Sequence, residues 1–187
     1  MTQKFAKFIL LKVLGWKYTP GEETVVPEDK AVMLAAPHTS IWDFALGYIY
    51  YRSIGGHLRT MIKKEAFFFP VNLLLKAMGG FPIDRSHPQQ MLMGIMHEME
   101  KEGTFHLVIC PEGTRKAVHK WKTGYHSIAT HAGVPVYLTH YDYGTKTVGR
   151  GQKFSLTGDA REDTRLIQQE YAKMNLTALY PEDYVTE

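Results

Sequence analysis

Short apolar runs of strand length alternate along this chain with segments of helical character, and this alternation limits the folds that the chain can adopt. Residues 31–36 form a continuous apolar run that ends at Pro37, a pattern typical of a strand buried on both faces. Further strands are predicted at residues 58–63, 81–83, 104–110, 134–140 and 153–156. Helices are predicted at residues 3–17, 41–52, 67–78, 88–101, 126–131 and 164–179. The alternation predicts an α/β fold with a largely parallel sheet flanked by helices.

The size and composition of the chain are those of one ordinary globular domain. With 187 residues the chain is long enough for one sizeable core, and it contains no repeat or linker that would divide it. The single cysteine, Cys110, excludes an intrachain disulfide framework and favours a reducing compartment. The net charge of +3 fits an anionic partner such as lipid headgroups, phosphate esters or nucleic acid, without choosing among them.

The amino-terminal segment combines apolar side chains with positive charge. Apolar residues at helical spacing are Phe5, Phe8, Ile9, Val13 and Trp16, and lysines stand at positions 4, 7, 12 and 17. Leu10, Leu11 and Leu14 lie on the opposite side of this helix, so it is apolar on two sides. We expect residues 1–17 to form a helix that associates with a membrane surface, with residues 18–187 as the remaining domain. The alternative is a terminal helix that docks on its own domain.

Neither a spanning helix nor a signal peptide is expected. No stretch of 18 apolar residues exists, and Lys7 and Lys12 interrupt the amino-terminal run, which lacks a small-residue cleavage site. The aromatic stretch at residues 67–69 is compatible with either a core position or a membrane-facing loop.

His38 and Asp43 are the first candidate catalytic pair. His38 follows the predicted strand at 31–36, and ligands of α/β proteins gather at the carboxyl ends of strands. A histidine acts as general base near neutral pH when a carboxylate orients its ring, and a turn would bring Asp43 to the imidazole. The competing interpretation is a loop histidine with Asp43 as a helix cap.

Two arginine sites follow along the chain. Arg85 stands after a predicted strand, and Glu112-Gly113-Thr114-Arg115 follows the apolar run that ends at Cys110. The planar guanidinium binds phosphate at two points, so both arginines are candidate phosphate ligands. The alternatives are a surface ion pair for Arg85 and a solvated turn for residues 112–115.

Four segments in this order resemble the conserved blocks of the glycerolipid acyltransferase superfamily, which includes the 1-acylglycerol-3-phosphate acyltransferases. The segments are His38-Thr-Ser-Ile-Trp-Asp43, Gly80-Phe-Pro-Ile-Asp-Arg85, Pro111-Glu-Gly-Thr-Arg115 and Gly133-Val-Pro-Val136. The resemblance implies the acyltransferase α/β core and assigns His38 as general base with Asp43 as its orienting partner. It further implies that Arg85, Glu112, Gly113, Thr114 and Arg115 bind the substrate phosphate.

The resemblance also implies a reaction, its substrates and its location. We expect transfer of a fatty acyl group from acyl-CoA or acyl-carrier protein to the hydroxyl of a lysophospholipid, in phospholipid biosynthesis. No metal, cofactor, covalent acyl-enzyme or nucleic-acid partner is implied, and we expect a peripheral protein on the cytoplasmic face of the cell membrane. Backbone amides in the loop after His38 are candidate donors to the oxyanion. The alternatives are a different acceptor, or a catalytically silent lipid-binding protein on the same fold.

Other residues of chemical interest lack a supporting pattern. The nine histidines show no recognised metal-ligand spacing, and His97-Glu98 lacks the second histidine of a zincin helix. Cys110 ends an apolar run and is expected to be a small buried hydrophobe.

Overall fold

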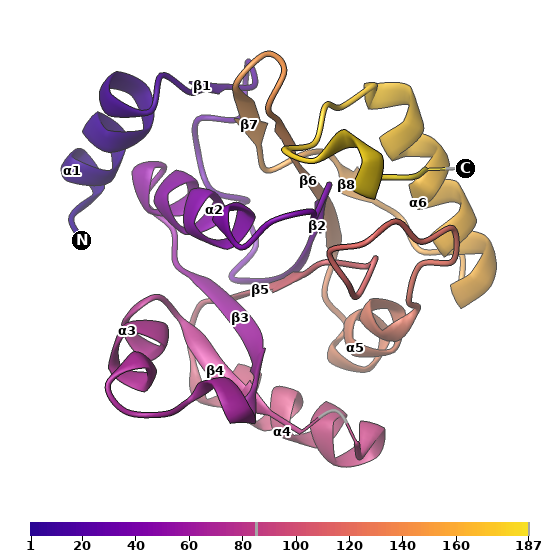
Figure 1. Ribbon diagram of the computed structural model, residues 1–187. Helices are drawn as coiled ribbons and strands as arrows, with labels where there is room; N and C mark the ends of the chain where they lie inside the picture. Colours follow the sequence, from indigo (N-terminus) through magenta and orange to yellow (C-terminus); the bar gives the residue numbers. More distant parts are fainter. Residues whose placement is uncertain (85, 187) are drawn as a thin grey trace.

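The computed structural model describes residues 1–84 and 86–186, and these residues form an eight-stranded sheet flanked by helices (Figure 1). The strands are β1 (Lys17–Tyr18), β2 (Lys30–Ala36), β3 (Leu58–Lys63), β4 (Gly80–Ile83), β5 (Phe105–Ile109), β6 (Val136–Asp142), β7 (Thr147–Gly149) and β8 (Lys153–Phe154). The α-helices are α1 (Gln3–Phe8), α2 (Trp42–Ser53), α3 (Val71–Ala77), α4 (Pro88–Lys101), α5 (Gly124–Ala132) and α6 (Ala160–Met174). A π-helical turn (η1, Ile9–Val13) and two 3₁₀ turns (η2, Lys64–Ala66; η3, Pro181–Asp183) complete the elements.

The sheet is largely parallel, as predicted. Its strand order is β1-β7-β6-β2-β5-β3-β4, with β8 also paired to β6. The five strands from β6 to β4 are all parallel to their neighbours, whereas β7 and β8 run antiparallel to β6. In the centre, Leu34 of β2 pairs with Ile109 of β5 and with Leu138 of β6. The carboxyl ends of β2 and β5 therefore lie side by side.

The sheet has a hydrophobic core on each face. Alternate residues of β2 enter the two cores, with Leu34 in one and Met33 in the other, which explains the unbroken apolar run of this strand. Helices α4, α5 and α6 cover the Leu34 face, and α2 with the amino-terminal helix covers the Met33 face (Figure 1). Tyr50 of α2 and Tyr171 of α6 are fully buried, one on each side.

Helix boundaries differ from the prediction where local signals compete. The amino-terminal helix ends at Val13 rather than at residue 17, since Gly15 adopts φ +69° and Lys17 pairs with β7. Helix α3 begins at Val71, because the residue before a proline avoids helical geometry and Phe69 precedes Pro70. Helix α6 starts four residues earlier than predicted.

The start and the end of α6 are set by its caps. The Asp159 side chain accepts hydrogen bonds from the backbone amides of Arg161 and Glu162, which fixes the first turn. Asn175, in a left-handed conformation, ends the helix after Met174, five residues before the predicted end at residue 179. Strands β1 and β7 were not predicted at all.

Candidate active site

His38 and Glu112 meet because they follow neighbouring parallel strands. His38 comes two residues after β2 and Glu112 comes three residues after β5. The backbone amide of His38 donates to Oε1 of Glu112 at 2.9 Å, although the two residues are 74 positions apart. The carboxyl ends of parallel strands are where α/β proteins place their ligands, so this is the expected edge of the sheet for a site.

Asp43 faces His38 from the first turn of α2. Its Oδ2 lies 3.3 Å from Nδ1 of His38 and accepts the backbone amides of Thr39 and Ser40 at 2.9 and 2.8 Å. Asp43 is 2% exposed, whereas the His38 side chain is 23% exposed. The structure therefore brings the predicted pair together, with a buried carboxylate below a ring that solvent can reach.

The contact between His38 and Asp43 is looser than a hydrogen bond of ordinary geometry. Among the described residues, Nδ1 of His38 has no hydrogen-bond partner, and its distance of 3.3 Å from Oδ2 of Asp43 is slightly longer than usual for an N–H···O bond. Catalytic hydrogen bonds are often long without substrate and shorten when it binds. Because Nδ1 faces Asp43, the other ring nitrogen, Nε2, is the one left to exchange a proton with a ligand.

Tyr143 holds the second oxygen of Asp43, a contact that the sequence did not predict. Its hydroxyl donates to Oδ1 at 2.6 Å from the turn between β6 and β7. Burial and the neighbouring Asp43 carboxylate raise the pKa of Tyr143 well above its ordinary value, so the hydroxyl keeps its proton. The two residues are 100 positions apart, and no motif in the sequence connects them.

Glu112 is a buried acid beneath the His38 loop. It is 4% exposed, and burial together with the nearby charge of Asp43 raises its pKa to about 8. Its Oε1 accepts the His38 amide, and its Oε2 has no hydrogen-bond partner among the described residues. The resemblance assigned Glu112 to phosphate binding. The observed contact shows a different interaction, in which Glu112 holds the loop that carries His38.

The backbone amides after β2 are already engaged. The amide of His38 donates to Glu112, and those of Thr39 and Ser40 donate to Asp43. A donor to an oxyanion needs a free N–H group aimed at the site. The amides of Thr39 and Ser40, which belong to the loop that the sequence suggested as a source of oxyanion donors, are therefore occupied in this structure.

The segment after Glu112 turns outward to solvent. Gly113 adopts φ +71°, and a Cβ there would approach Cγ of Lys122 to 3.0 Å, so glycine is needed at this turn. Oγ1 of Thr114 accepts the amide of Lys116 at 3.3 Å, and the Arg115 side chain is exposed. The site edge thus carries hydroxyl and guanidinium donors that solutes can reach.

Arg85 lies outside the described residues, so its predicted phosphate contact is untested. Its neighbour Asp84 accepts Lys64 Nζ at 2.6 Å and the Ser86 amide at 2.9 Å. The Lys64 ammonium, followed by the Ser86 donors, lowers the pKa of Asp84 well below its ordinary value. Asp84 follows β4, which is separated from β2 by β3 and β5.

A small, mostly apolar cavity, which we call the passage, lies beneath α2 with Asp43 among its lining residues. Its residues are Asp43, Phe44, Gly47, Tyr48, Leu58, Thr60, Met78, Val108 and Tyr141. The passage has a volume of about 20 Å³, room for roughly one water molecule. Three of its residues, Tyr48, Leu58 and Met78, also line a second and larger cavity, so the two spaces adjoin.

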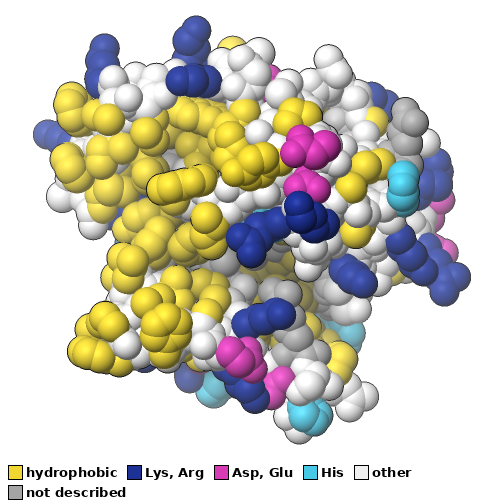
Figure 2. All heavy atoms as spheres, in the orientation of Figure 1, with side chains coloured by type: hydrophobic (Ala, Val, Ile, Leu, Met, Phe, Trp, Pro, Cys, Tyr) yellow, Lys and Arg dark blue, Asp and Glu magenta, His cyan; other side chains and the backbone are white. Residues whose placement is uncertain are grey.

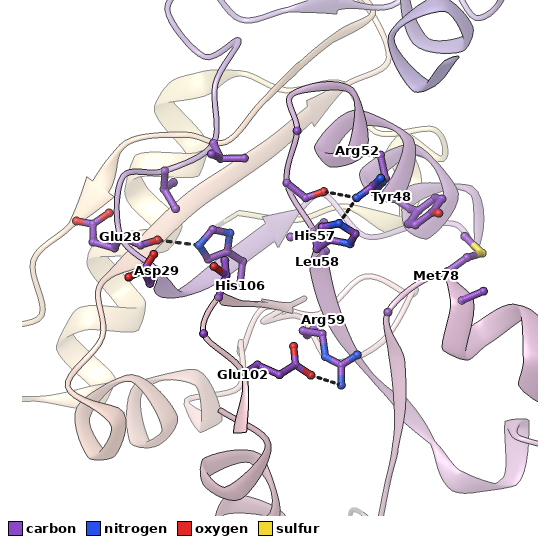
Figure 3. A pocket seen from close by; sticks show the side chains of 18 of the residues that line it. Glu28, Asp29, Tyr48, Arg52, His57, Leu58, Arg59, Met78, Glu102 and His106 are labelled. Carbon is purple, nitrogen blue, oxygen red and sulfur yellow. Dashed lines mark hydrogen bonds and ion pairs between the residues drawn. The ribbon is translucent and has the colours of Figure 1, made fainter. Parts of the chain in front are cut away.

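The larger cavity, of about 800 Å³, opens near the amino ends of β2, β3 and β5 (Figure 3). Its charged side chains include Arg59, which pairs with Glu102 at 3.0 Å, and Arg52, which contacts His57. His106 bonds Tyr51 at 2.6 Å and the Glu28 carbonyl at 2.8 Å. The side of this cavity that Tyr48, Leu58 and Met78 line adjoins the passage.

One face of the molecule exposes large apolar side chains (Figure 2). They come from the amino-terminal helix, the start of α2 and the α3 region: Phe5, Phe8, Val13, Leu14, Ile41, Trp42, Phe68, Phe69, Leu73 and Leu74. We call these ten side chains the apolar face. The sequence left open whether residues 67–69 lie in the core or in a membrane-facing loop. Phe68 and Phe69 are exposed, so these two side chains do not belong to the core. Trp42 is the immediate neighbour of Asp43, so the apolar face reaches the candidate site.

Two further features are absent from the part of the chain that the structure describes. In residues 1–84 and 86–186, no group of three His, Cys, Asp or Glu side chains is arranged to hold a metal ion. No helix in the same ranges is both long and apolar enough to cross a bilayer.

Comparison with known proteins agrees with this arrangement. The sequence profile of a family described as Acyltransferase matches residues 19–139, more than half of the chain. No curated protein gives a significant match. Among solved structures, the chain is similar to the 1-acyl-sn-glycerophosphate (LPA) acyltransferase PlsC from Thermotoga maritima, with a TM-score of 0.59 and 18% identity over 92% of this chain and 78% of that one. A likeness at this identity establishes the fold.

Proposed function

The chain belongs to the acyltransferase family, and on this premise we propose that it transfers a fatty acyl group from an acyl thioester to the hydroxyl of a lysophospholipid such as 1-acylglycerol-3-phosphate. The observation that carries the proposal is the His38–Asp43 pair, set at the carboxyl end of the central strand β2 with its carboxylate buried. The named activity of the Thermotoga maritima protein of the same fold supports this acceptor class.

The chemistry assigned to the pair follows from its geometry. Nε2 of His38 takes the proton of the acceptor hydroxyl while the oxygen attacks the thioester carbonyl, and the Asp43 carboxylate stabilises the imidazolium that forms. The tetrahedral intermediate then releases the thiolate, which receives the proton from His38, and the new oxygen ester remains. The pair needs neither a metal nor a covalent acyl-enzyme for this sequence of steps.

The phosphate of the acceptor is assigned to the exposed edge of the site. Arg115 offers two parallel donors to a phosphate, and Thr114 adds a hydroxyl. Arg85 is assigned as a further phosphate ligand, because the segment Gly80–Arg85 resembles a block of the glycerolipid acyltransferase superfamily. The turn at Gly113 supports this role, because the chain passes there from the buried Glu112 to the exposed Arg115.

The passage beneath α2 is assigned to the acyl chain. It begins at Asp43, its side chains are mostly apolar, and it leads toward the 800 Å³ cavity. Entry of a chain would require Thr60, Met78 and their neighbours to move apart, since the free passage holds only about 20 Å³. The flexible thioether of Met78, at the junction of the two spaces, is suited to such movement.

The apolar face is assigned to the surface of the membrane, on its cytoplasmic side. Its ten side chains lie with exposed lysines 4, 7 and 12 on the amino-terminal helix, and apolar area with basic charge is the combination that binds anionic lipid. The alternation of buried Ala6 and Leu10 with exposed Phe5 and Phe8 means that this helix packs on the domain with one side and faces outward with the other.

An acceptor panel tests the proposal. Purified protein with palmitoyl-CoA is offered 1-acylglycerol-3-phosphate, the matching lysophospholipid without a terminal phosphate, and a monoacylglycerol, and products are measured by mass spectrometry. We expect the phosphate-bearing acceptor to react best, and Arg115→Ala to raise its KM about tenfold or more while leaving the monoacylglycerol rate unchanged. Equal rates for all three acceptors would refute the phosphate assignment, and binding without turnover for every acceptor and for an acyl-carrier-protein donor would favour a lipid-binding protein.

A further inference from the structure

The two oxygens of the Asp43 carboxylate have unequal support. Oδ2 accepts the Thr39 and Ser40 amides and faces the His38 ring. Oδ1 accepts the Tyr143 hydroxyl at 2.6 Å. A carboxylate rotates easily about its terminal bond, so the donor on Oδ1 restrains this rotation together with the two amides on Oδ2.

Tyr143 is itself held on two sides. Its backbone amide donates to the Thr177 carbonyl at 2.8 Å, which ties the β6–β7 turn to the segment after α6. The ring of Trp16 packs edge-on against the Tyr143 ring, with centroids 5.0 Å apart and planes at 87°. The Tyr143 phenol is therefore restrained both at its backbone and at its ring.

Trp16 connects this support to the amino-terminal helix. It is 7% exposed, its amide donates to the Leu10 carbonyl at 3.0 Å, and the next residue, Lys17, donates to the Lys146 carbonyl at 2.8 Å. The segment that follows the amino-terminal helix therefore carries the Trp16 ring that packs against Tyr143, and the same helix carries Phe5 and Phe8 of the apolar face.

We propose that Tyr143 is a positioning residue for the catalytic pair: its hydroxyl fixes the Asp43 carboxylate so that Oδ2 faces Nδ1 of His38, and Trp16 holds the Tyr143 ring in the plane that this requires. The inference rests on the proposed role of His38 as base. Through Trp16, the orientation of the pair depends on the correct seating of the amino-terminal helix.

Tyr143→Phe is the direct test, because it removes the hydroxyl and keeps the ring on Trp16. The matched control is Tyr137→Phe, which removes a tyrosine–carboxylate hydrogen bond of the same 2.6 Å length, to Glu28, and Tyr137 lies on β6, the strand that leads into the turn with Tyr143. We expect Tyr143→Phe to lower kcat about ten- to a hundredfold with little change in either KM, as for loss of a hydrogen bond to a charged group. Equal kcat losses in the two variants would overturn the proposal.

A second readout does not depend on turnover. The ring ¹⁵N signals of His38, identified by their loss in His38→Ala, report which ring nitrogen carries the proton. We expect one dominant tautomer in the unaltered protein and in Tyr137→Phe, and a mixture of tautomers in Tyr143→Phe. If the unaltered protein transfers no acyl group, the proposed function fails, whereas the positioning role of Tyr143 is still decided by these signals; unchanged signals in Tyr143→Phe would refute it.

Trp16 is tested by a double-mutant cycle with Tyr143. We expect Trp16→Ala to lower kcat and Trp16→Phe to retain most of it. The double variant Trp16→Ala with Tyr143→Phe should lose little more activity than Tyr143→Phe alone, because both changes act on one carboxylate. Circular dichroism checks that each variant is folded, and Trp16→Phe replaces Trp16→Ala in the cycle if the latter is not. Fully additive losses would remove Trp16 from the proposal.

Discussion

The backbone amide of His38 donates to the buried carboxyl of Glu112 at 2.9 Å, and this bond joins two motifs that are 74 residues apart. The bond joins the loop after β2 to the loop after β5. Asp43 of α2 also holds the loop after β2, because it accepts the Thr39 and Ser40 amides. Glu112 thereby acts on the ring of His38 through its backbone. The position of the candidate base is therefore set by two carboxyl groups, one beside the imidazole and one beneath its main chain.

Glu112 makes the stability of the fold depend on pH in a stated direction. Its pKa rises from 4.5 to about 8 on burial, so between these values the folded protein binds a proton that the unfolded chain has lost. The free energy of unfolding therefore falls as pH rises through this window, by at most ~1.4 kcal/mol per pH unit from this group.

Glu112→Gln removes this titration and keeps an oxygen that accepts the His38 amide. Urea unfolding at about pH 5 and about pH 8 should give a smaller difference in the free energy of unfolding for Glu112→Gln than for the unaltered protein. Glu112→Ala, which leaves the His38 amide without its partner, should lower activity more than Glu112→Gln does. Identical pH dependence in the unaltered protein and Glu112→Gln would contradict the raised pKa.

The apolar face predicts which exposed residues matter for membrane binding. Phe68→Ser and Phe69→Ser should each weaken binding to anionic vesicles about tenfold, since burial of a phenyl side chain contributes ~1.5–3 kcal/mol. Met93→Ser on α4 is the matched control, because Met93 is 64% exposed but lies on a helix that covers the other side of the sheet. Vesicle sedimentation measures all three, and an equal effect of Met93→Ser would show that the face has no special role.

The amino-terminal helix needs point substitutions for the same test. Removal of residues 1–17 would also delete Ala6, Leu10 and Trp16, which are buried, and the loss of core would be confused with loss of an anchor. Phe5→Ser with Phe8→Ser leaves the packed side intact. We expect weaker vesicle binding at an unchanged melting temperature, and unchanged binding would assign the helix to packing alone.

The passage beneath α2 predicts a change in acyl-chain preference. Met78→Ala should widen the junction with the larger cavity and favour longer acyl-CoA donors, whereas Thr60→Leu should narrow it and favour shorter ones. One methylene in an apolar pocket changes kcat/KM by roughly tenfold or more, which a chain-length series resolves. Met61→Leu is the control, because Met61 neighbours Thr60 but packs in the core on the other face of the sheet. A shift with Met61→Leu and none with Met78→Ala would place the acyl chain elsewhere.

The fold was largely predictable because its main elements carry a clear periodicity. The buried strand β2, the strand β3 and the helix α4 with Pro88 at its first position were all located from the sequence. Strands β1 and β7, of two and three residues, are too short to carry a period and were missed. The start of α6 was missed because its signal is the single cap Asp159 rather than an apolar pattern.

The site was predictable in its residues and less so in its contacts. His38 and Asp43 lie in one turn, and their proximity follows from five residues of local sequence. The bond from His38 to Glu112 depends on the pairing of β2 with β5, and the bond from Tyr143 to Asp43 joins residues 100 positions apart. Such contacts are products of the tertiary fold, for which no local pattern exists.

The most direct test of the central claim is thiol release from palmitoyl-CoA in detergent micelles, with and without 1-acylglycerol-3-phosphate, for the unaltered protein, His38→Ala and His131→Ala. His131 is an exposed histidine on α5 and serves as the matched control. We predict acceptor-dependent release that His131→Ala retains and His38→Ala lowers about a hundredfold or more, since general base catalysis contributes ~10²–10⁴-fold. Retention of more than about a tenth of the rate in His38→Ala would contradict the assignment of His38 as the base.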